Sequence, residues 1–311
     1  MSKITIVGAG SVGSTAAFSL AENAIADEIV IVDINKNKSL GNALDIAHGL
    51  PLLKPVNIYA GDYEDTKNSD IVVITVGVPE VVGESRLIPL QKNTDILKGV
   101  IPQLLKYSPN TQILMVSNPV DILTYVAYKI SNLPKSKVIG LGTVLDSSRF
   151  KYLLGKEFNL DGRCINGYMI GEHGDSQIAA WSKTSIAGGS IEEYCNAIGY
   201  ELSDDFKDNI EAQVKQTAFD VWEMKGPNCF CVANAIKTVT EAILRNEQTI
   251  LPISTIIEGE YGIKDVSLSL PSILGKNGVK KVLDLPLGDN ELNGFKNSAS
   301  IMKSLIDQLD I

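Results

Sequence analysis

The stretch Gly8-Ala9-Gly10-Ser11-Val12-Gly13 decides the fold. It follows an apolar run at residues 4–7 and opens a helix-forming segment at residues 14–23. A turn of this kind lets the backbone approach the pyrophosphate of a dinucleotide, and the following helix N-terminus favours its negative charge. Asp33 ends the next apolar run, where a carboxylate accepts hydrogen bonds from both ribose hydroxyls and repels a 2′-phosphate. The pattern therefore predicts binding of NAD in preference to NADP.

The first half of the chain alternates short apolar runs with helix-forming segments. The runs are rich in Val and Ile, which is typical of strands buried on both faces of a parallel sheet. We expect strands at residues 4–7, 29–32, 56–59, 71–76, 112–116 and 138–141, and helices at residues 14–23, 36–47, 91–107 and 119–131. This alternation predicts an α/β fold whose first domain, residues 1–143, is a doubly wound parallel (Rossmann) sheet.

The pattern changes near residue 143. A long helix is expected at residues 144–158, followed by strands at 163–170 and 181–187 and helices at 204–225 and 229–245. Strand-like segments follow at 251–258 and 267–273, and a helix at 292–311 closes the chain. We interpret residues 144–311 as a mixed α+β substrate domain, packed against the first domain with the active site between them.

Composition limits the possible partners. The net charge is −9 and the isoelectric point about 4.9, whereas binding to nucleic acid or an anionic membrane needs clustered Lys and Arg. No apolar run approaches the roughly 20 residues of a membrane helix, and no signal-peptide pattern is present, so we expect a cytoplasmic protein. The four cysteines form no Cys-x-x-Cys pair, and we interpret them as reduced thiols that bind no metal.

One of only two histidines lies in the segment Gly171-Glu172-His173-Gly174-Asp175-Ser176. Glycines beside an imidazole allow the backbone to approach a ligand closely, and histidine exchanges a proton near neutral pH. Asp146 and Arg149 are three residues apart on an expected helix, so they share roughly one face. Taken alone, each feature has an ordinary structural explanation, such as a polar turn or an ion pair along a helix.

Two further segments lie where sheets of this type bind ligands. Gly83-Glu84-Ser85-Arg86 follows the fourth strand, and Ser117-Asn118-Pro119-Val120-Asp121 follows the fifth. Together with the glycine turn, Leu145-Asp146-Ser147-Ser148-Arg149-Phe150 and the histidine segment, they occur in a fixed order. As a set they resemble the L-lactate/L-malate dehydrogenase family, closest to its bacterial L-lactate members, over essentially the whole chain.

The resemblance implies a role for each matching residue. His173 would exchange the proton of the substrate hydroxyl, Asp146 would orient His173, and Arg149 would bind the substrate carboxylate. Arg86 would polarise the 2-keto oxygen from a loop, residues 79–89, that closes over the substrate, and Asn118 would contact the reacting oxygen. The residues expected at the NAD site are Gly8, Gly10, Val12, Gly13, Asp33, Gly77, Asn93, Ser117 and Asn118.

Two positions depart from the lactate members of the family. Glu80 stands six residues before Arg86, where lactate enzymes usually have Gln and malate enzymes Arg. A carboxylate there would repel the second carboxylate of oxaloacetate, which disfavours malate as the substrate. Asn228 stands where lactate enzymes commonly carry Thr. Both changes admit a larger or more polar 2-keto acid, although we favour a solvent-facing Glu80 and an enzyme that interconverts pyruvate and L-lactate.

Regulation and assembly follow from the same resemblance. Many bacterial relatives are activated by fructose 1,6-bisphosphate through an Arg and a His at a subunit interface; here these positions hold Lys151 and Asn166. Because Lys lacks the bidentate fork and Asn lacks an ionisable donor, we expect no strong activation. The family implies a homotetramer or a dimer. We interpret the other histidine, His48, as structural, since Gly49 and Pro51 mark a helix end.

Two other classes of protein are compatible with the nucleotide-binding turn. NAD-dependent glycosidases share the fold, but they need a metal held by Cys and His, and no Cys is near His173 in the sequence. A nucleotide sensor without chemistry should have lost one of His173, Arg86, Asp146 or Arg149, and all four are present. We therefore predict an NAD-dependent oxidoreductase that acts on the CH–OH group of L-2-hydroxy acids in glycolysis and fermentation.

Overall fold

The computed structural model describes residues 1–78 and 87–311. Six parallel strands form the centre of the fold in the order β3-β2-β1-β4-β5-β6. Their bounds are Lys3–Val7 for β1, Glu28–Val32 for β2, Asn57–Ala60 for β3, Ile71–Ile74 for β4, Gln112–Met115 for β5 and Val138–Gly140 for β6. The predicted doubly wound sheet is confirmed, with each strand within two residues of its expected position.

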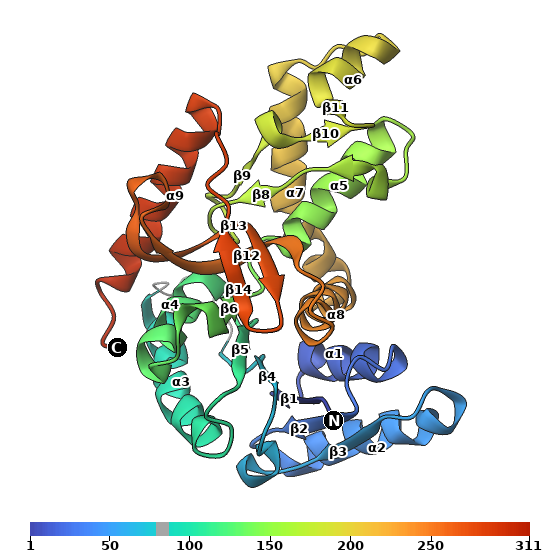
Figure 1. Cartoon of the computed structure of the whole chain (residues 1–311), viewed down its shortest axis with the longest axis vertical. Helices are drawn as coiled ribbons and strands as arrows, with labels where there is room; N and C mark the ends of the chain where they lie inside the picture. Colours follow the sequence, from blue (N-terminus) through green and yellow to red (C-terminus); the bar gives the residue numbers. More distant parts are fainter. Residues whose placement is uncertain (79–86) are drawn as a thin grey trace.

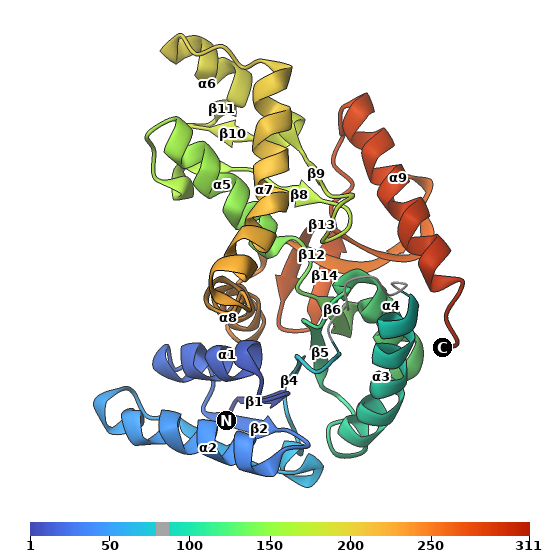
Figure 2. The ribbon, with the colours of Figure 1, turned by 180° about the vertical axis from the view of Figure 1, so that it is seen from behind.

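Helices cover both faces of this sheet (Figures 1 and 2). Helices α1 (Ser11–Glu22) and α2 (Lys36–Gly49) lie on one face, and α3 (Leu87–Tyr107) and α4 (Val120–Ser131) lie on the other. Each face has its own core of buried side chains, because strand residues alternate between the two sides. The strands are buried on both faces, which explains their continuous Val and Ile content.

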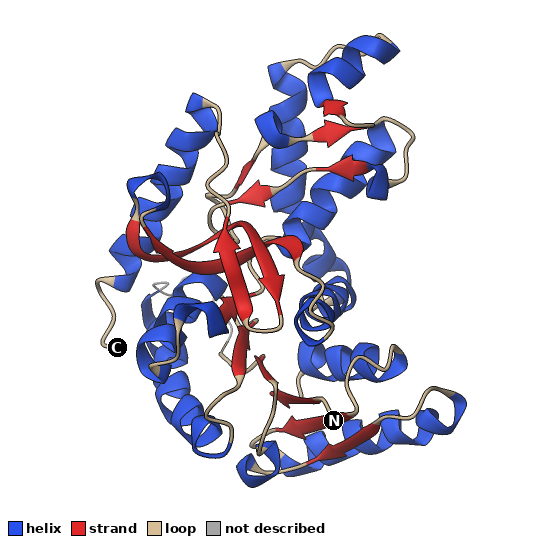
Figure 3. Ribbon diagram, in the orientation of Figure 1, coloured by secondary structure: helices blue, strands red, loops and turns tan. Residues whose placement is uncertain are grey.

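The C-terminal strands extend this sheet instead of forming one of their own (Figure 3). Strand β12 (Thr249–Glu258) pairs antiparallel with β6 at Ser254 and Gly140, and β13 (Lys264–Gly275) and β14 (Gly278–Val282) follow outward. A residue larger than Gly at position 140 would bring its Cβ within 2.8 Å of the Ser254 side chain. The sheet therefore has nine described strands.

A second body is built from α5 (Val144–Glu157), α6 (Ile191–Ile198), α7 (Asp204–Lys225) and several short strands. The expected strand at 163–170 is wrong in part, because a 3-10 turn (Gly162–Cys164) precedes two short strands, β7 (Ile165–Asn166) and β8 (Met169–Ile170). Likewise, 181–187 starts as a 3-10 turn (Trp181–Lys183) before β10 (Ser185–Ile186). The remaining short strands are β9 (Ile178–Ala179) and β11 (Gly189–Ser190).

Aromatic packing accounts for the second of these interruptions, at residues 181–187. Trp181 packs edge-on against Phe150 at 5.0 Å between ring centroids, and its indole N–H donates to Glu211 on α7. These contacts turn the chain inward where sequence periodicity predicted an extended strand. The helices α8 (Phe230–Leu244) and α9 (Asp289–Ile306) return to the large sheet, α8 against α1 and α9 beside β13. The described residues include no helix long and apolar enough to span a membrane.

Candidate active site

The glycine turn between β1 and α1 forms a tight cradle. Gly8 has a φ of +109° and donates its N–H to the Val32 carbonyl of β2. A Cβ at Gly13 would lie 1.9 Å from the Gly8 carbonyl oxygen, so this position excludes any side chain. A Cβ at Gly10 would meet nothing within 4 Å, and no side chain caps the N-terminus of α1. The open space beside an uncapped helix N-terminus fits a pyrophosphate.

Asp33 is fixed beside this cradle at the end of β2. Its Oδ2 accepts the Ala9 N–H at 2.6 Å, and its Oδ1 accepts the Asn35 N–H at 2.7 Å. The half-buried carboxylate thus helps to hold the glycine turn and has a fixed orientation. This is the place where the sequence predicts contact with the ribose of NAD.

Asn93 joins the loops that follow β4 and β5. Its Oδ1 accepts the Val78 N–H at 2.7 Å, and its Nδ2 donates to the carbonyl oxygens of Val78 and Asn118 at 3.2 and 3.3 Å. Gly77 packs against the same amide, because a Cβ there would lie 3.1 Å from Asn93 Oδ1. Asn93 is buried and bonded to backbone through both ends of its amide, so in this structure it positions the loops around the predicted cofactor site.

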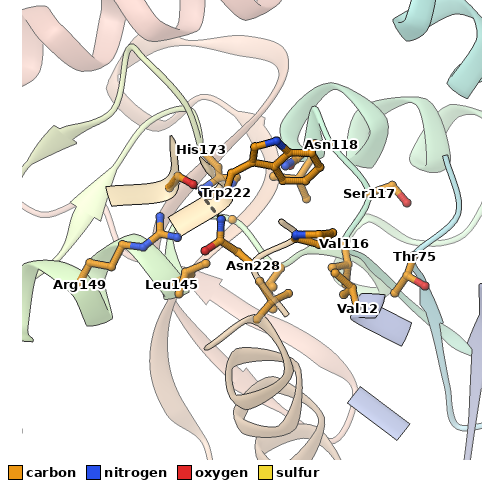
Figure 4. A pocket seen from close by; sticks show the side chains of 16 residues that line it. Val12, Thr75, Val116, Ser117, Asn118, Leu145, Arg149, His173, Trp222 and Asn228 are labelled. Atoms are coloured by element: carbon orange, nitrogen blue, oxygen red, sulfur yellow. Dashed lines mark hydrogen bonds between the residues drawn. The ribbon is translucent and has the colours of Figure 1, made fainter. Parts of the chain in front are cut away.

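A cleft of about 640 Å³ runs from the glycine turn to the second body of the protein. It brings together nine of the predicted site residues: Gly10, Val12, Gly13, Gly77, Ser117, Asn118, Asp146, Arg149 and His173. An adjoining pocket of about 290 Å³ adds Asn228 to the wall beside Arg149 and His173 (Figure 4). Gly8, Asp33 and Asn93 lie behind this surface and support it.

The histidine segment and helix α5 meet at one carboxylate. Asp146 is almost completely buried, and its two oxygens bind different partners. Oδ2 contacts His173 Nδ1 at 2.5 Å, and Oδ1 accepts the Arg149 Nη1–H at 3.1 Å. The bond at Nδ1 directs Nε2 of the ring away from Asp146, as a proton-exchanging group requires. The predicted grouping of His173, Asp146 and Arg149 is present in the geometry.

Burial and charge oppose each other at this pair. Burial by itself would lower the pKa of His173, but the negative charge of Asp146 and its hydrogen bond outweigh burial, and the pKa is raised above its ordinary value. Burial would likewise raise the pKa of Asp146, but the charges of His173 and Arg149 hold it below its ordinary value. The pair therefore favours an imidazolium beside a carboxylate, and the imidazolium is the form that can donate a proton.

Comparison with known proteins agrees with this geometry. The model of the lactate/malate dehydrogenase NAD-binding domain matches residues 2–140, and that of the α/β C-terminal domain matches residues 143–310. The chain belongs to the lactate/malate dehydrogenase family. It is an NAD-dependent oxidoreductase of that family, with the family's NAD-binding domain as its first part.

Relatives match over their full length. The L-lactate dehydrogenase of Thermoanaerobacterium saccharolyticum is 52% identical over 311 residues, covering 100% of both chains. L-lactate dehydrogenase 1 of Clostridium acetobutylicum is 50% identical, covering 99% of this chain and 98% of the relative. The ligand-bound crystal structure of the minor L-lactate dehydrogenase from Enterococcus mundtii is similar, with a TM-score of 0.96, 34% identity and coverage of 100% and 99%.

The structure describes only some of the residues expected to set substrate choice. Asn228 lines the small pocket, and its Nδ2 donates to the Ala218 carbonyl of α7 at 2.9 Å. Asn118, in the loop that follows β5, lines the same pocket. Glu80 and Arg86 lie outside the described residues, as does most of the loop expected to close over the substrate.

Sequence reasoning missed four residues on one face of α7 and the buried Asp121. Trp222 lines both parts of the cleft and is 55% exposed, and Lys215, Ala218 and Phe219 join it from the same face of α7. Their spacing of three and four residues is a signal that could have identified the face. Asp121 was quoted only as part of a motif, yet it is buried beneath His173 and accepts the His173 backbone N–H at 2.7 Å.

Lys151 and Asn166 lie together in a separate cavity of about 330 Å³. Tyr168 and Cys231 also line it, and the Lys151 ammonium lies 6.0 Å from the Tyr168 ring centroid. Burial lowers the pKa of Lys151. The predicted regulatory positions are thus neighbours in space. Among the described residues, no cluster of three or more His, Cys, Asp or Glu side chains is placed to hold a metal ion.

Proposed function

We propose that the protein is an L-lactate dehydrogenase that interconverts pyruvate and L-lactate with NAD. The observation that carries the proposal is the small pocket, where His173 lies beside one guanidinium, that of Arg149. Arg149 is the only Lys or Arg among the described residues that line it. Its guanidinium matches the single carboxylate of pyruvate, and Glu80 stands where malate enzymes have the Arg that would pair with a second carboxylate. The full-length relatives named L-lactate dehydrogenase support the same substrate.

Each residue of the site has a separate role in the reduction of pyruvate. Arg149 binds the substrate carboxylate and fixes its angle, and the imidazolium of His173 donates its proton to the 2-keto oxygen. Asp146 keeps the ring oriented and stabilises its charged form before the transfer. Bound NADH supplies the hydride that adds to C2. In the reverse direction neutral His173 accepts the hydroxyl proton, so oxidation is favoured at higher pH.

Arg86, Glu80 and Asn118 complete the proposed site. Arg86 stabilises the negative charge that grows on the keto oxygen during reduction, and Asn118 contacts the same oxygen. Glu80 supplies no cation for the second carboxylate of oxaloacetate. The NAD contacts are proposed at Gly8, Gly10, Val12, Gly13, Asp33, Gly77, Asn93, Ser117 and Asn118.

Asn228 supports a second candidate substrate. Its Nδ2 is bonded to Ala218, and no bond from a described residue to its carbonyl oxygen is found beside the pocket. A 2-keto acid with a hydrogen-bond donor on its side chain would satisfy that oxygen better than the methyl of pyruvate. The test is kcat/KM for a panel of 2-keto acids with NADH. Pyruvate far above oxaloacetate supports the proposal, and a preference for a donor-bearing acid supports the second candidate.

We also propose a cytoplasmic homo-oligomer, a tetramer or a dimer, divided into domains at residues 1–143 and 144–311. Exposed leucines support the assembly, because Leu40 and Leu44 on α2 and Leu52 and Leu53 just after it are all at least 40% exposed. Apolar groups gathered in this way are typical of subunit interfaces. Light scattering coupled to size-exclusion chromatography tests the assembly, and a monomeric mass would contradict it.

A further inference from the structure

Asp121 is a buried acid that the reaction described above does not use. It lies in the first turn of α4 and is almost completely inaccessible to solvent. Burial raises its pKa to about 6, although hydrogen bonds from Ser254 and from the His173 backbone act in the opposite direction. A buried carboxylate is unfavourable unless its surroundings compensate for the lost hydration. Its position at the base of the active site therefore calls for a functional explanation.

The hydrogen bonds of Asp121 connect four elements. Oδ2 accepts the backbone N–H of His173 at 2.7 Å, and Oδ1 accepts the hydroxyl of Ser254 at 2.6 Å. Ser254 Oγ lies in turn 2.9 Å from Ser267 Oγ. A chain of bonds thus runs from β13 through β12 to α4, and from there to the histidine loop.

We propose that Asp121 is a positioning residue for the reaction: its carboxylate fixes the peptide of His173 and places a second negative charge beside the imidazole. The preceding residues of the loop are held elsewhere. Gly171 pairs with Ser269 of β13, and the Glu172 N–H donates to Ser298 Oγ on α9. Asp121 provides the contact at the peptide of His173 itself.

Asp121 and Asp146 both carry a negative charge near His173, but they are paired with different groups. Asp146 shares its charge with the Arg149 guanidinium, which acts against protonation of the ring. The hydrogen-bond partners of Asp121 are neutral, an amide and a hydroxyl, so its charge acts on the imidazole without an intervening cation. Among the described residues, the other acids that line the cleft with His173 are Glu172 and Asp175 on its own loop. This inference rests on the proposed role of His173 as proton donor.

The variant Asp121→Asn removes the negative charge but can keep both hydrogen bonds. The Asn oxygen can accept the His173 N–H, and its amide can donate to Ser254, whose hydroxyl then turns toward Ser267. Asp121→Ala removes charge and bonds together. Ser267→Ala is the matched control, because it alters the same buried chain but leaves Asp121 with both of its direct partners.

Histidine NMR gives the decisive readout. The chain has only two histidines, so labelling at Cε1 gives two signals, and His48 at the exposed end of α2 serves as the internal reference. We expect the His173 signal of Asp121→Asn to titrate at lower pH than in the wild type. Ser254→Ala removes one hydrogen-bond donor from the Asp121 carboxylate, so the titration of His173 should also move to lower pH, but by less. Ser267→Ala should titrate as the wild type does.

Turnover provides the second readout. In Asp121→Asn the alkaline limb of kcat/KM for keto-acid reduction should move to lower pH, with kcat at low pH within about threefold of the wild type. In Asp121→Ala, kcat should fall about a hundredfold at every pH, because the imidazole is misplaced. An unchanged His173 titration in both Asp121→Asn and Ser254→Ala overturns the inference. The titration needs no substrate, so failure to reduce pyruvate would overturn the proposed function separately.

Discussion

Replacing Asp121 by Asn should stabilise the protein while weakening its chemistry. The carboxylate has an ordinary pKa of 3.8, and burial raises it to about 6 in the folded protein. A raised acid pKa means that the folded state resists ionisation. The contribution of Asp121 to stability is therefore fully present below pH 3.8 and is lost as the pH rises through about 6. Asn does not ionise and avoids this loss.

The expected gain in stability follows from the shift in the pKa of Asp121. About 2.2 pH units, the difference between 6 and 3.8, correspond to about 3 kcal/mol at pH 7.5, with 1.36 kcal/mol for each unit. For 311 residues the entropy of unfolding is about 0.65 kcal/mol/K, so the same difference raises Tm by about 5 °C. The gain should shrink below pH 6 and approach zero near pH 4.

Differential scanning fluorimetry of both proteins from pH 4 to 7.5 measures this difference. Asp146→Asn is the control of opposite sign, because the pKa of Asp146 is lowered and its charged form stabilises the fold. That variant should lose Tm at pH 7.5. A pH-independent Tm difference between Asp121→Asn and the wild type would refute the reasoning, since it would show that the buried carboxylate does not titrate as argued.

Four further outcomes are expected. NADH should be strongly preferred over NADPH, and Asp33→Ser should narrow the ratio of their kcat/KM values by removing repulsion of the 2′-phosphate; equal use of both cofactors by the wild type would contradict this. His173→Asn should lower kcat at least a thousandfold while fluorescence titration shows nearly intact NADH binding, and full activity would remove the mechanism. Glu80→Arg should raise kcat/KM for oxaloacetate by supplying a cation for its second carboxylate, and an unchanged value would show that position 80 does not face the substrate. Fructose 1,6-bisphosphate should change the KM for pyruvate less than about twofold, because Lys151 and Asn166 lack the usual donors, and a larger change would show that they suffice.

Much of the fold and part of the site are local properties of the sequence. The glycine turn could be predicted because Gly8 and Gly13 meet steric limits that only glycine satisfies, and the two-sided burial of the strands left continuous Val and Ile runs. Asp146 and Arg149 share a helix face through their spacing alone. The geometry of these features is specified by residues that lie close together in the sequence.

Tertiary structure decided the rest, because the decisive contacts join residues far apart in sequence. The Trp181 contacts with Phe150 and Glu211 interrupt the strand that periodicity predicted at residues 181–187. The C-terminal strands could have formed their own sheet, but the pairing of Ser254 with Gly140 joins them to the first. The bond from His173 to Asp121 spans 52 residues. Loop closure over such distances depends on how the elements pack, and no local pattern encodes it.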